Sequence, residues 1–439
     1  MRSWSAERVA DAAGARLVEP GDGAGGPSRA VIDSRHAGPG DLFVGLPGER
    51  VDGGRFAADV LGAGAWGVLV GEGWAGVENP TGGDGAILVA PDPLAALQRL
   101  ATAWRRELGA QVIGITGSTG KTSTKDLTAA MVDQQRRVVA TPLNLNTEIG
   151  LPLTVLGAPA GTEVLVLEMA MRGAGQIAEL AHIAEPDVGV VVNVGPVHLE
   201  LLGTIEAIAA TKSELLEGLR PGGTAIVPAD EPLLNTHLEQ LPEGVSTVTF
   251  GPGGDVEELP ADLQLPFTSA HMRRNALAAL AAARAVGVEP TGALEVALSE
   301  LRGQRRELPG GVVVIDDCYN ANPMSMRAAL DDLAASAGGS GSRLVAVLGD
   351  MLELGPDEIR FHEEIGAHAR GAGLDLLVTV GPLAAAMGPA FGGRTVAVDA
   401  AGEAVDALRP LLAEGDTVLV KASRGVGLEV VARGLAAGG

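Results

Sequence analysis

The chain of 439 residues is poor in several residue types, and each shortage narrows what it can be. It contains one cysteine, Cys318, so no disulfide can form within the chain, and a reducing compartment is expected. Aromatic residues make up only 3% of the sequence, so the core has to be built from Ala, Val, Leu and Ile. No apolar run has membrane-spanning length, and the first residues lack the apolar segment of a signal peptide. We therefore expect a cytoplasmic protein without membrane insertion.

Positive charge is also scarce, with 32 Lys and Arg against 55 Asp and Glu and a formal net charge of −23. A surface of this sign repels nucleic acid phosphates, so we expect no nucleic acid partner, although solubility alone can explain the charge. Any anionic substrate has to be held by local cations and backbone donors against this field. The length is too great for one hydrophobic core and indicates about three domains.

Alternating strand and helix patterns predict an α/β fold with three domains. A small N-terminal α/β domain covers 1–108. A central domain covers 109–310, with strands at 112–115, 164–168, 188–194 and 224–228 and helices near 122–135, 173–183, 204–219 and 272–286. This order indicates a parallel sheet with helices on both faces. The C-terminal domain, 311–439, is predicted to be doubly wound and Rossmann-like, with strands at 312–316, 344–348, 376–380, 395–398 and 417–421.

Residues 114–126 read GITGSTGKTSTKD and are typical of a phosphate-binding loop. An apolar strand enters a Gly-rich turn that opens onto a helix, whose N-terminus attracts anions. Lys121 can reach the outer phosphates of a nucleotide, and the Thr122 hydroxyl can bind Mg²⁺. Ile115 stands where the usual first glycine of the P-loop would be, and a Gly/Thr-rich loop that merely contains a lysine is the alternative. The predicted nucleotide-binding residues are Gly117, Ser118, Thr119, Gly120, Lys121, Thr122 and Ser123.

Three further candidates follow the loop in the sequence. Glu168 ends an apolar strand, where a carboxylate is well placed for Mg²⁺, although an ordinary strand-end acid is the alternative. His198 lies just past another strand, and a lone histidine is more often structural than a ligand. Lys212 is the only lysine between Lys125 and Lys421, and its pattern alone fits a solvated helix-face lysine.

These residues lie in segments that resemble the Mur ligases of peptidoglycan synthesis over nearly the whole chain. The segments include GSTGKTSTKD, NLNTEIGLPLT, EMAMRGAGQI, NVGPVHLELLGT, DDCYNANP, LGDMLELG and VKASRGVGLE. Several of them are most similar to the family member that adds D-alanyl-D-alanine to UDP-N-acetylmuramoyl-tripeptide. The resemblance implies ATP-dependent amide formation through an acyl phosphate, the last cytoplasmic step toward the pentapeptide precursor. It also implies a monomer.

The resemblance further implies roles for the candidate residues. Lys121 and the loop amides would hold the ATP phosphates, and Thr122 and Glu168 would bind one Mg²⁺. His198 would serve a second Mg²⁺, together with Lys212 after its carbamylation by CO₂. The other implied ATP contacts are Asn144 and Asn146 near the adenine, Asn275 near the nucleotide, Arg305 (or Arg306) at the hinge, and Asp317, Asn320 and Asn322 beside the ribose. Ser34 and Arg35 would contact the uridine diphosphate, and Lys421 and Ser423 would complete the closed site.

Some positions depart from the family pattern. Ser269-Ala270-His271-Met272 replaces a usual Gly-Arg-His-Asn, Asp52-Gly53-Gly54 replaces Asp-Gly-His, and segment 251–266 is short. The Gly, Pro and Arg cluster at 303–311 indicates a hinge about which the C-terminal domain closes on the nucleotide. Cys318 is expected to pack rather than to act as a nucleophile.

Two alternative functions stay open at this point. One is another amino-acid ligase of the same superfamily, of the tripeptide-forming or folylpolyglutamate type. The other is a P-loop ATPase that serves as a binding module.

Overall fold

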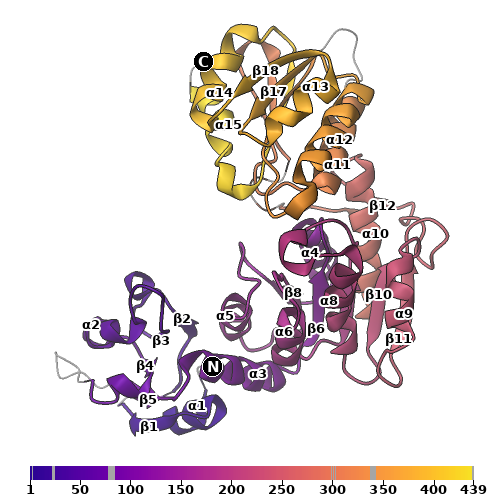
Figure 1. Cartoon of the computed structure of the whole chain (residues 1–439). Helices are drawn as coiled ribbons and strands as arrows, with labels where there is room; N and C mark the ends of the chain where they lie inside the picture. Colours follow the sequence, from indigo (N-terminus) through magenta and orange to yellow (C-terminus); the bar gives the residue numbers. More distant parts are fainter. Residues whose placement is uncertain are drawn as a thin grey trace.

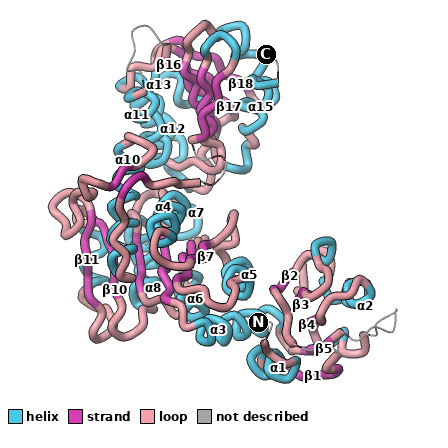
Figure 2. The backbone as a smooth tube through the Cα atoms, turned by 180° about the vertical axis from the view of Figure 1, so that it is seen from behind, coloured by secondary structure: helices cyan, strands magenta, loops and turns pink. Residues whose placement is uncertain are grey.

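Three large sheets follow one another along the described chain and give an elongated molecule, with the N-terminal and C-terminal sheets at opposite ends (Figure 1; Figure 2 shows the reverse side). A fourth, two-stranded sheet is small. The computed structural model describes residues 1, 3–21, 25–77, 85–297, 299, 301, 303–336 and 343–437. Each sheet is mostly parallel, and helices cover its faces. The predicted α/β fold with a central P-loop sheet is confirmed.

The N-terminal sheet has the order β1-β5-β4-β3-β2, and only β1 is antiparallel to its neighbour. Its strands are β1 Arg16–Glu19, β2 Arg29–Val31, β3 Asp41–Val44, β4 Gly67–Val70 and β5 Ala86–Val89. Helix α2 (Ala57–Gly62) covers one face through Val60 and Leu61. Helix α1 (Ala6–Ala13) belongs to the core on the other face.

Helix α3, Pro93–Leu108, joins the first sheet to the second. It begins after Asp92, whose carboxylate accepts hydrogen bonds from two first-turn amides, and ends at Gly109 in the left-handed conformation. Leu97 and Leu100 belong to one core that extends into both sheets, and Trp104 meets Trp4 edge to face at 5.4 Å. Because α3 shares this core with both units, the boundary after residue 108 stays a prediction.

The central sheet is entirely parallel, with the order β11-β10-β9-β6-β8-β7. Its strands are β6 Gln111–Thr116, β7 Val138–Ala140, β8 Val164–Glu168, β9 Val188–Val191, β10 Thr224–Pro228 and β11 Ser246–Phe250. Helices α4 (Lys121–Asp133) and α10 (Ala270–Ala285) pack on one face. Helices α5 (Gly150–Gly157), α6 (Gln176–Ala184) and α8 (Ile205–Glu217) pack on the other. The carboxyl ends of β6, β8 and β9 therefore meet at one edge, where ligands of such sheets bind.

The C-terminal sheet has the order β14-β15-β19-β16-β17-β18, with β14 antiparallel. Its strands are β14 Gln304–Glu307, β15 Val313–Asp316, β16 Leu344–Gly349, β17 Leu376–Val380, β18 Arg394–Val398 and β19 Thr417–Lys421. Helices α11 (Pro323–Ala335), α12 (Glu358–Gly371) and α13 (Met387–Phe391) lie on one face. Helices α14 (Ala401–Leu408) and α15 (Glu429–Ala437) lie on the other.

Strand β14 lies within the segment predicted to act as a hinge, 303–311. Four residues within 303–311 pair with β15, and they join the C-terminal sheet before the predicted boundary at residue 311. A paired strand resists bending, so a hinge within Gln304–Glu307 gains no support from this pairing. The boundary and the hinge stay predictions.

The C-terminal unit touches the central unit beside the carboxyl end of β9. Leu199, in the short helix α7 (Leu199–Leu202), packs against the C-terminal core. A Cβ on Gly195 would collide with the sulfur of Met324 at the start of α11. His271 of α10 lies 3.0 Å from the Asp332 carboxylate on α11. The remaining short elements, α9 (Asn235–Leu238), β12 (Leu263–Gln264) and β13 (Gly292–Ala293), lie at the margin of the central unit.

Candidate active site

The Gly-rich loop lies between β6 and α4, as predicted, and glycine is required at its last position. Gly120 has φ +74, a left-handed conformation that costs a residue with a Cβ about 1–2 kcal/mol. A Cβ there would also lie only 2.6 Å from Oδ1 of Asn275. Asn275 comes from α10 and is buried against the loop. The structure therefore brings Asn275 to the loop, where the resemblance placed the nucleotide.

Gly120→Ala is expected to weaken ATP binding roughly 10- to 100-fold, since it strains the loop and displaces Asn275. Isothermal titration with ATP and Mg²⁺ measures the effect. Gly109→Ala is the matched control, because Gly109 has a similar φ of +62 but open space around a Cβ. Equal affinity losses in both variants would show that the contact with Asn275 is irrelevant.

Two of the loop amides already have partners inside the protein. The Ser118 and Thr119 N–H groups donate to Oδ1 of Asn193, at 3.1 and 2.9 Å. The Ser118 hydroxyl donates to the carbonyl of Gly195. The proposal that these two amides hold phosphates therefore gains no support from this arrangement. Sequence reasoning missed Asn193, although it lies five residues before His198 in the same motif.

Lys121 is the first residue of α4, and its ammonium folds back over the loop. Nζ donates to the carbonyl of Gly117 at 2.7 Å. The positive end of the helix dipole lies at the same point. The loop thus presents a cation and a helix N-terminus together, the arrangement that binds phosphate. Thr122 and Ser123 follow in the first turn of α4.

Glu168 is buried at the carboxyl end of β8, only 3% exposed, and faces this first turn. Its Oε2 accepts a hydrogen bond from the Thr122 hydroxyl at 2.8 Å, and its Oε1 accepts one from the Asn146 amide at 2.7 Å. A carboxylate and a hydroxyl at this separation are hard oxygen donors that fit one Mg²⁺. The Asn146 amide thus orients Glu168, while Asn144 is exposed. That either asparagine lies near the adenine stays a prediction.

His198 reaches across to the C-terminal unit. Its Nδ1 lies 2.5 Å from Oε2 of Glu353, and both residues have positive φ, 53 and 63. Burial lowers the pKa of His198, and Glu353 opposes this shift only in part. A neutral imidazole held through Nδ1 leaves Nε2 as a metal ligand. Sequence reasoning assigned no role to Glu353, although its motif LGDMLELG contributed to the resemblance.

Lys212 is buried in α8, only 1% exposed, which excludes the solvated-lysine alternative. Burial, and next the positive charge of Lys121, hold the pKa of Lys212 well below its ordinary value. Within the described part of the chain, no group accepts a hydrogen bond from its ammonium and no carboxylate lies at ion-pair distance. Burial favours the neutral form of the amine, which is the form that reacts with CO₂, so the site is compatible with carbamylation.

A preformed metal cluster does not exist among the described residues. No three His, Cys, Asp or Glu side chains converge there. Glu168 with Thr122 offers oxygen donors for one ion. A second ion at His198 would need further oxygen donors, which a carbamate on Lys212 would provide.

The predicted residues of the C-terminal unit form a cluster of their own. Nζ of Lys421, at the end of β19, donates to Asp317 at 2.6 Å and to the carbonyl of Asn320 at 3.0 Å. Cys318 is buried in the same motif, and burial raises the pKa of its thiol. This environment supports packing and argues against a nucleophilic cysteine.

The other C-terminal predictions have local partners. Ser423 donates to the carbonyl of Ala321 and accepts from the amide of Leu352. Asn322 caps α11 in a capping box with Ser325. Arg305 is exposed and donates to Ser336. Across the described ranges, no hydrogen bond or ion pair joins these residues to the phosphate loop. Their nucleotide roles therefore stay predictions, as does that of Arg306.

Ser34 and Arg35 lie in the N-terminal unit, in the short turn after β2. The Arg35 side chain is 84% exposed and pairs with Asp33, whose pKa this hydrogen bond lowers. Nearby, Gly54 stands where the family usually has histidine, and a Cβ there would collide with the ring of Trp74. A side chain at this position is excluded by the indole.

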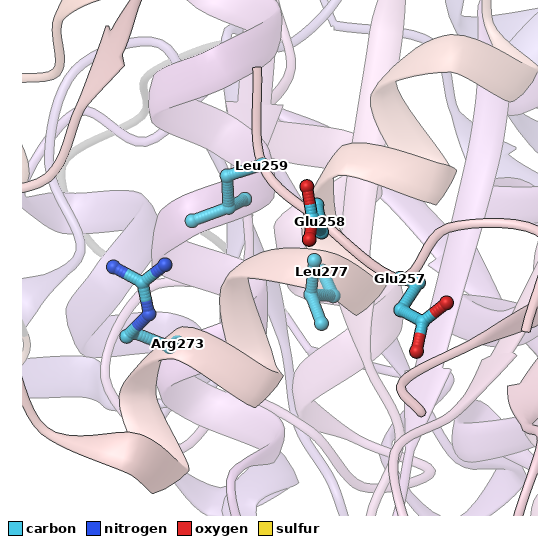
Figure 3. A pocket seen from close by; sticks show the side chains of 5 residues that line it. All are labelled: Glu257, Glu258, Leu259, Arg273 and Leu277. Carbon is cyan, nitrogen blue, oxygen red and sulfur yellow. The ribbon is translucent and has the colours of Figure 1, made fainter. Parts of the chain in front are cut away.

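The pocket in Figure 3 is not the nucleotide site. It is lined by Glu257, Glu258, Leu259, Arg273 and Leu277. Arg273 and Leu277 are each two residues from Asn275 on α10, so they point to the opposite side of the helix. The pocket therefore lies behind α10, away from the phosphate loop.

A Gly-rich loop between a parallel strand and a helix, with a carboxylate on the adjacent strand, defines a P-loop nucleotide-binding protein that handles phosphoryl groups with a divalent cation. Comparison with known proteins narrows this class. Residues 115–268 match the Mur ligase middle domain, and residues 301–424 match the Mur ligase glutamate ligase domain. The chain belongs to the Mur ligase family.

Relatives that match over most of their length share one name. UDP-N-acetylmuramoyl-tripeptide–D-alanyl-D-alanine ligase of Bacillus subtilis (strain 168) is 39% identical, with 92% of each chain covered. The Escherichia coli (strain K12) protein of the same name is 33% identical over 92% of this chain and 93% of that one. The crystal structure of MurF from Acinetobacter baumannii matches with a TM-score of 0.83 and 29% identity over 99% of both chains.

Two further solved structures resemble this chain to different degrees. MurF from Thermotoga maritima in complex with ADP has a TM-score of 0.80 and 30% identity, covering 93% of this chain and 97% of that one. FolC from E. coli, with DHPP and ADP, has a TM-score of 0.55 and 20% identity over 76% of this chain and 92% of that one. The likeness to FolC extends to the fold alone.

Proposed function

We propose that this protein is the ATP-dependent ligase that joins D-alanyl-D-alanine to UDP-N-acetylmuramoyl-tripeptide, completing the peptidoglycan pentapeptide precursor. The observation that carries the proposal is full-length similarity, 39% identity over 92% of the chain, to ligases of that name. An ADP complex of a MurF relative supports ATP as the phosphoryl donor. A folylpolyglutamate-type activity has only a shared fold in its favour.

The reaction requires activation of a carboxylate. The terminal carboxylate of the tripeptide attacks the γ-phosphorus of ATP, so that ADP leaves and an acyl phosphate forms. This step brings two anions together, and Lys121 with the N-terminus of α4 offsets the repulsion. The neutral amine of D-alanyl-D-alanine then attacks the acyl carbon, loses a proton, and phosphate departs with the former carboxylate oxygen.

Divalent cations fit the residues at the loop. Thr122 and Glu168 would hold one Mg²⁺, and His198 with carbamylated Lys212 would hold a second. Bound ions would neutralise developing charge on the transferred phosphoryl group. The buried Lys212 amine, in its neutral form, would add to CO₂ and lose a proton, and the product would be a carboxylate-like ligand in place of an amine.

The C-terminal unit would close over the nucleotide and exclude water from the acyl phosphate, which hydrolyses readily. Asp317 and Lys421 would then approach the ATP ribose and phosphates, with Asn320, Asn322 and Ser423 shaping the wall. Ser34 and Arg35 would contact the uridine diphosphate.

None of the helices in the described chain has the length and apolarity needed to cross a bilayer. We propose a monomer that acts in the cytoplasm.

Glu353→Gln is expected to lower kcat roughly tenfold or more and to raise the Mg²⁺ concentration needed for half-maximal rate. The carboxylate that holds His198 Nδ1 is lost, and charged hydrogen bonds of this kind are worth about 1.5–3 kcal/mol. Steady-state rates across a Mg²⁺ titration measure both effects. Glu363→Gln, an exposed carboxylate on α12, is the control. An unchanged Mg²⁺ dependence would remove Glu353 from the site.

The function is tested by phosphate release from ATP and Mg²⁺ in the presence of UDP-N-acetylmuramoyl-tripeptide, with and without D-alanyl-D-alanine. We expect turnover to need both acceptors and the product to have the mass of the pentapeptide. Release that ignores both acceptors would identify an ATPase module. Release with the tripeptide and a different amine would identify another ligase of the family.

A further inference from the structure

Asn193 makes a dense set of hydrogen bonds to the phosphate loop. It follows β9 and lies on the neighbouring strand end, outside the loop itself. Its Oδ1 accepts from the amides of Ser118 and Thr119, at 3.1 and 2.9 Å. Its Nδ2 donates to the hydroxyl and the carbonyl of Thr119, at 3.0 and 3.2 Å. Its own carbonyl also accepts from the amide of Ser118. Every polar group of Thr119 is thereby bonded to one side chain.

We propose that Asn193 is the positioning residue of the phosphate loop, a role that rests on the proposed binding of ATP there. The loop Gly117–Gly120 carries two glycines, whose backbone freedom opposes a single conformation. The hydrogen bonds from Asn193 fix the positions of Ser118 and Thr119. They thereby orient Gly120 and the start of α4 toward the nucleotide. A loop that is ordered before binding loses less entropy when phosphates arrive.

The chemistry of the side chain explains why asparagine stands there. The loop offers two N–H donors and two oxygen acceptors, and a primary amide matches both kinds at once. Aspartate keeps the acceptor but loses the donors toward Thr119. Alanine loses both and leaves the Thr119 amide without its partner, while the Ser118 amide keeps the backbone carbonyl of residue 193. An amide left without a partner costs more than a typical hydrogen bond contributes.

The segment that carries Asn193 also touches the C-terminal unit. The Ser118 hydroxyl exchanges hydrogen bonds with the carbonyl and amide of Gly195, at 3.0 and 2.9 Å. Gly195 in turn packs against Met324, and His198 bonds Glu353. The six residues 193–198 therefore hold the loop at one end and meet the closing unit at the other. Asn193 therefore lies in a segment that contacts both the phosphate loop and the C-terminal unit.

The experiment compares the full-length protein with Asn193→Ala and Asn193→Asp. Amide hydrogen exchange of the 114–126 peptide measures how firmly Asn193 holds the loop amides. Calorimetry with ADP and Mg²⁺ measures the Kd for the nucleotide. For Asn193→Ala we expect the Thr119 amide of this peptide to exchange at least roughly tenfold faster, whereas the Ser118 amide keeps a backbone acceptor. We also expect the Kd for ADP to rise roughly 10- to 100-fold. Asn193→Asp is expected to keep the slow exchange, since it keeps the acceptor oxygen.

Asn235→Ala, an exposed asparagine at the start of α9, is the control and should change neither quantity. A folded Asn193→Ala protein with unchanged exchange and unchanged Kd would overturn the proposal. A tighter Kd would overturn it as well, since it would show that the released Thr119 amide binds phosphate itself. Neither measurement needs the tripeptide or D-alanyl-D-alanine. A failed ligase assay with intact ADP binding would therefore contradict the proposed function and leave the role of Asn193 standing.

Discussion

Lys212→Ala is expected to reduce the ligase rate at least about 100-fold, because it removes the amine that would become a metal-binding carbamate. Added acetate or formate should restore part of the activity, since a small carboxylate can occupy the space left by the side chain. Initial rates of phosphate release with both acceptors, across a titration of the carboxylate, measure the loss and the rescue.

Lys212→Met is the matched control for the rescue. Methionine fills the space that alanine leaves, so activity should be lost without recovery in carboxylate. Burial keeps the pKa of Lys212 below its unfolded value of 10.5, so the unfolded chain binds more protons than the folded one at a pH between the two pKa values. Keeping the lysine therefore costs folding free energy, a cost that shrinks as the pH rises toward 10.5. Lys212→Met should raise the free energy of unfolding at pH 7. An active Lys212→Met protein would remove the carbamate role.

Lys121→Ala is expected to lower ATP turnover about 1,000-fold. The Lys121 ammonium lies against the loop carbonyl of Gly117 at the N-terminus of α4, where it can follow the phosphoryl group as charge develops. Such an interaction is stronger in the transition state than in the bound substrate, so kcat should fall more than ATP affinity. Initial rates over a range of ATP concentrations, together with calorimetry, separate the two.

The control for charge is Arg8→Ala, which removes an exposed cation from α1 and should leave the rate unchanged. If Lys121→Ala kept more than a tenth of the rate, the loop could not be the phosphoryl site. Loss of ATP affinity with an unchanged kcat would instead assign Lys121 to binding alone.

The sequence predicted the buried parallel strands well, because long apolar runs between turns have few alternative structures. β8, β10, β17 and β19 have the predicted bounds. The short edge strands β7, β11 and β14 were not predicted. β14 reads QRRE and is largely exposed, so its pairing with β15 depends on a neighbour that no local pattern reveals.

Some residues of the candidate site could likewise be predicted from the sequence, and others could not. The loop and its strand–helix context follow from local spacing, and the meeting of Glu168 with Thr122 follows from the strand order. Asn193 and Glu353 could not be found, because their partners are 74 and 155 residues away in the sequence. The burial of Lys212 could not be predicted either, since the acidic residues of α8 suggest a solvated helix face.

The central claim is amide formation through an acyl phosphate, and an oxygen-18 transfer experiment tests it most directly. The terminal carboxylate of the tripeptide is labelled, and the protein is incubated with ATP, Mg²⁺ and D-alanyl-D-alanine. We predict one labelled oxygen in each phosphate released and a pentapeptide that retains the other. Unlabelled phosphate, released without pentapeptide, would show that water and not the carboxylate attacks ATP, and would contradict the account.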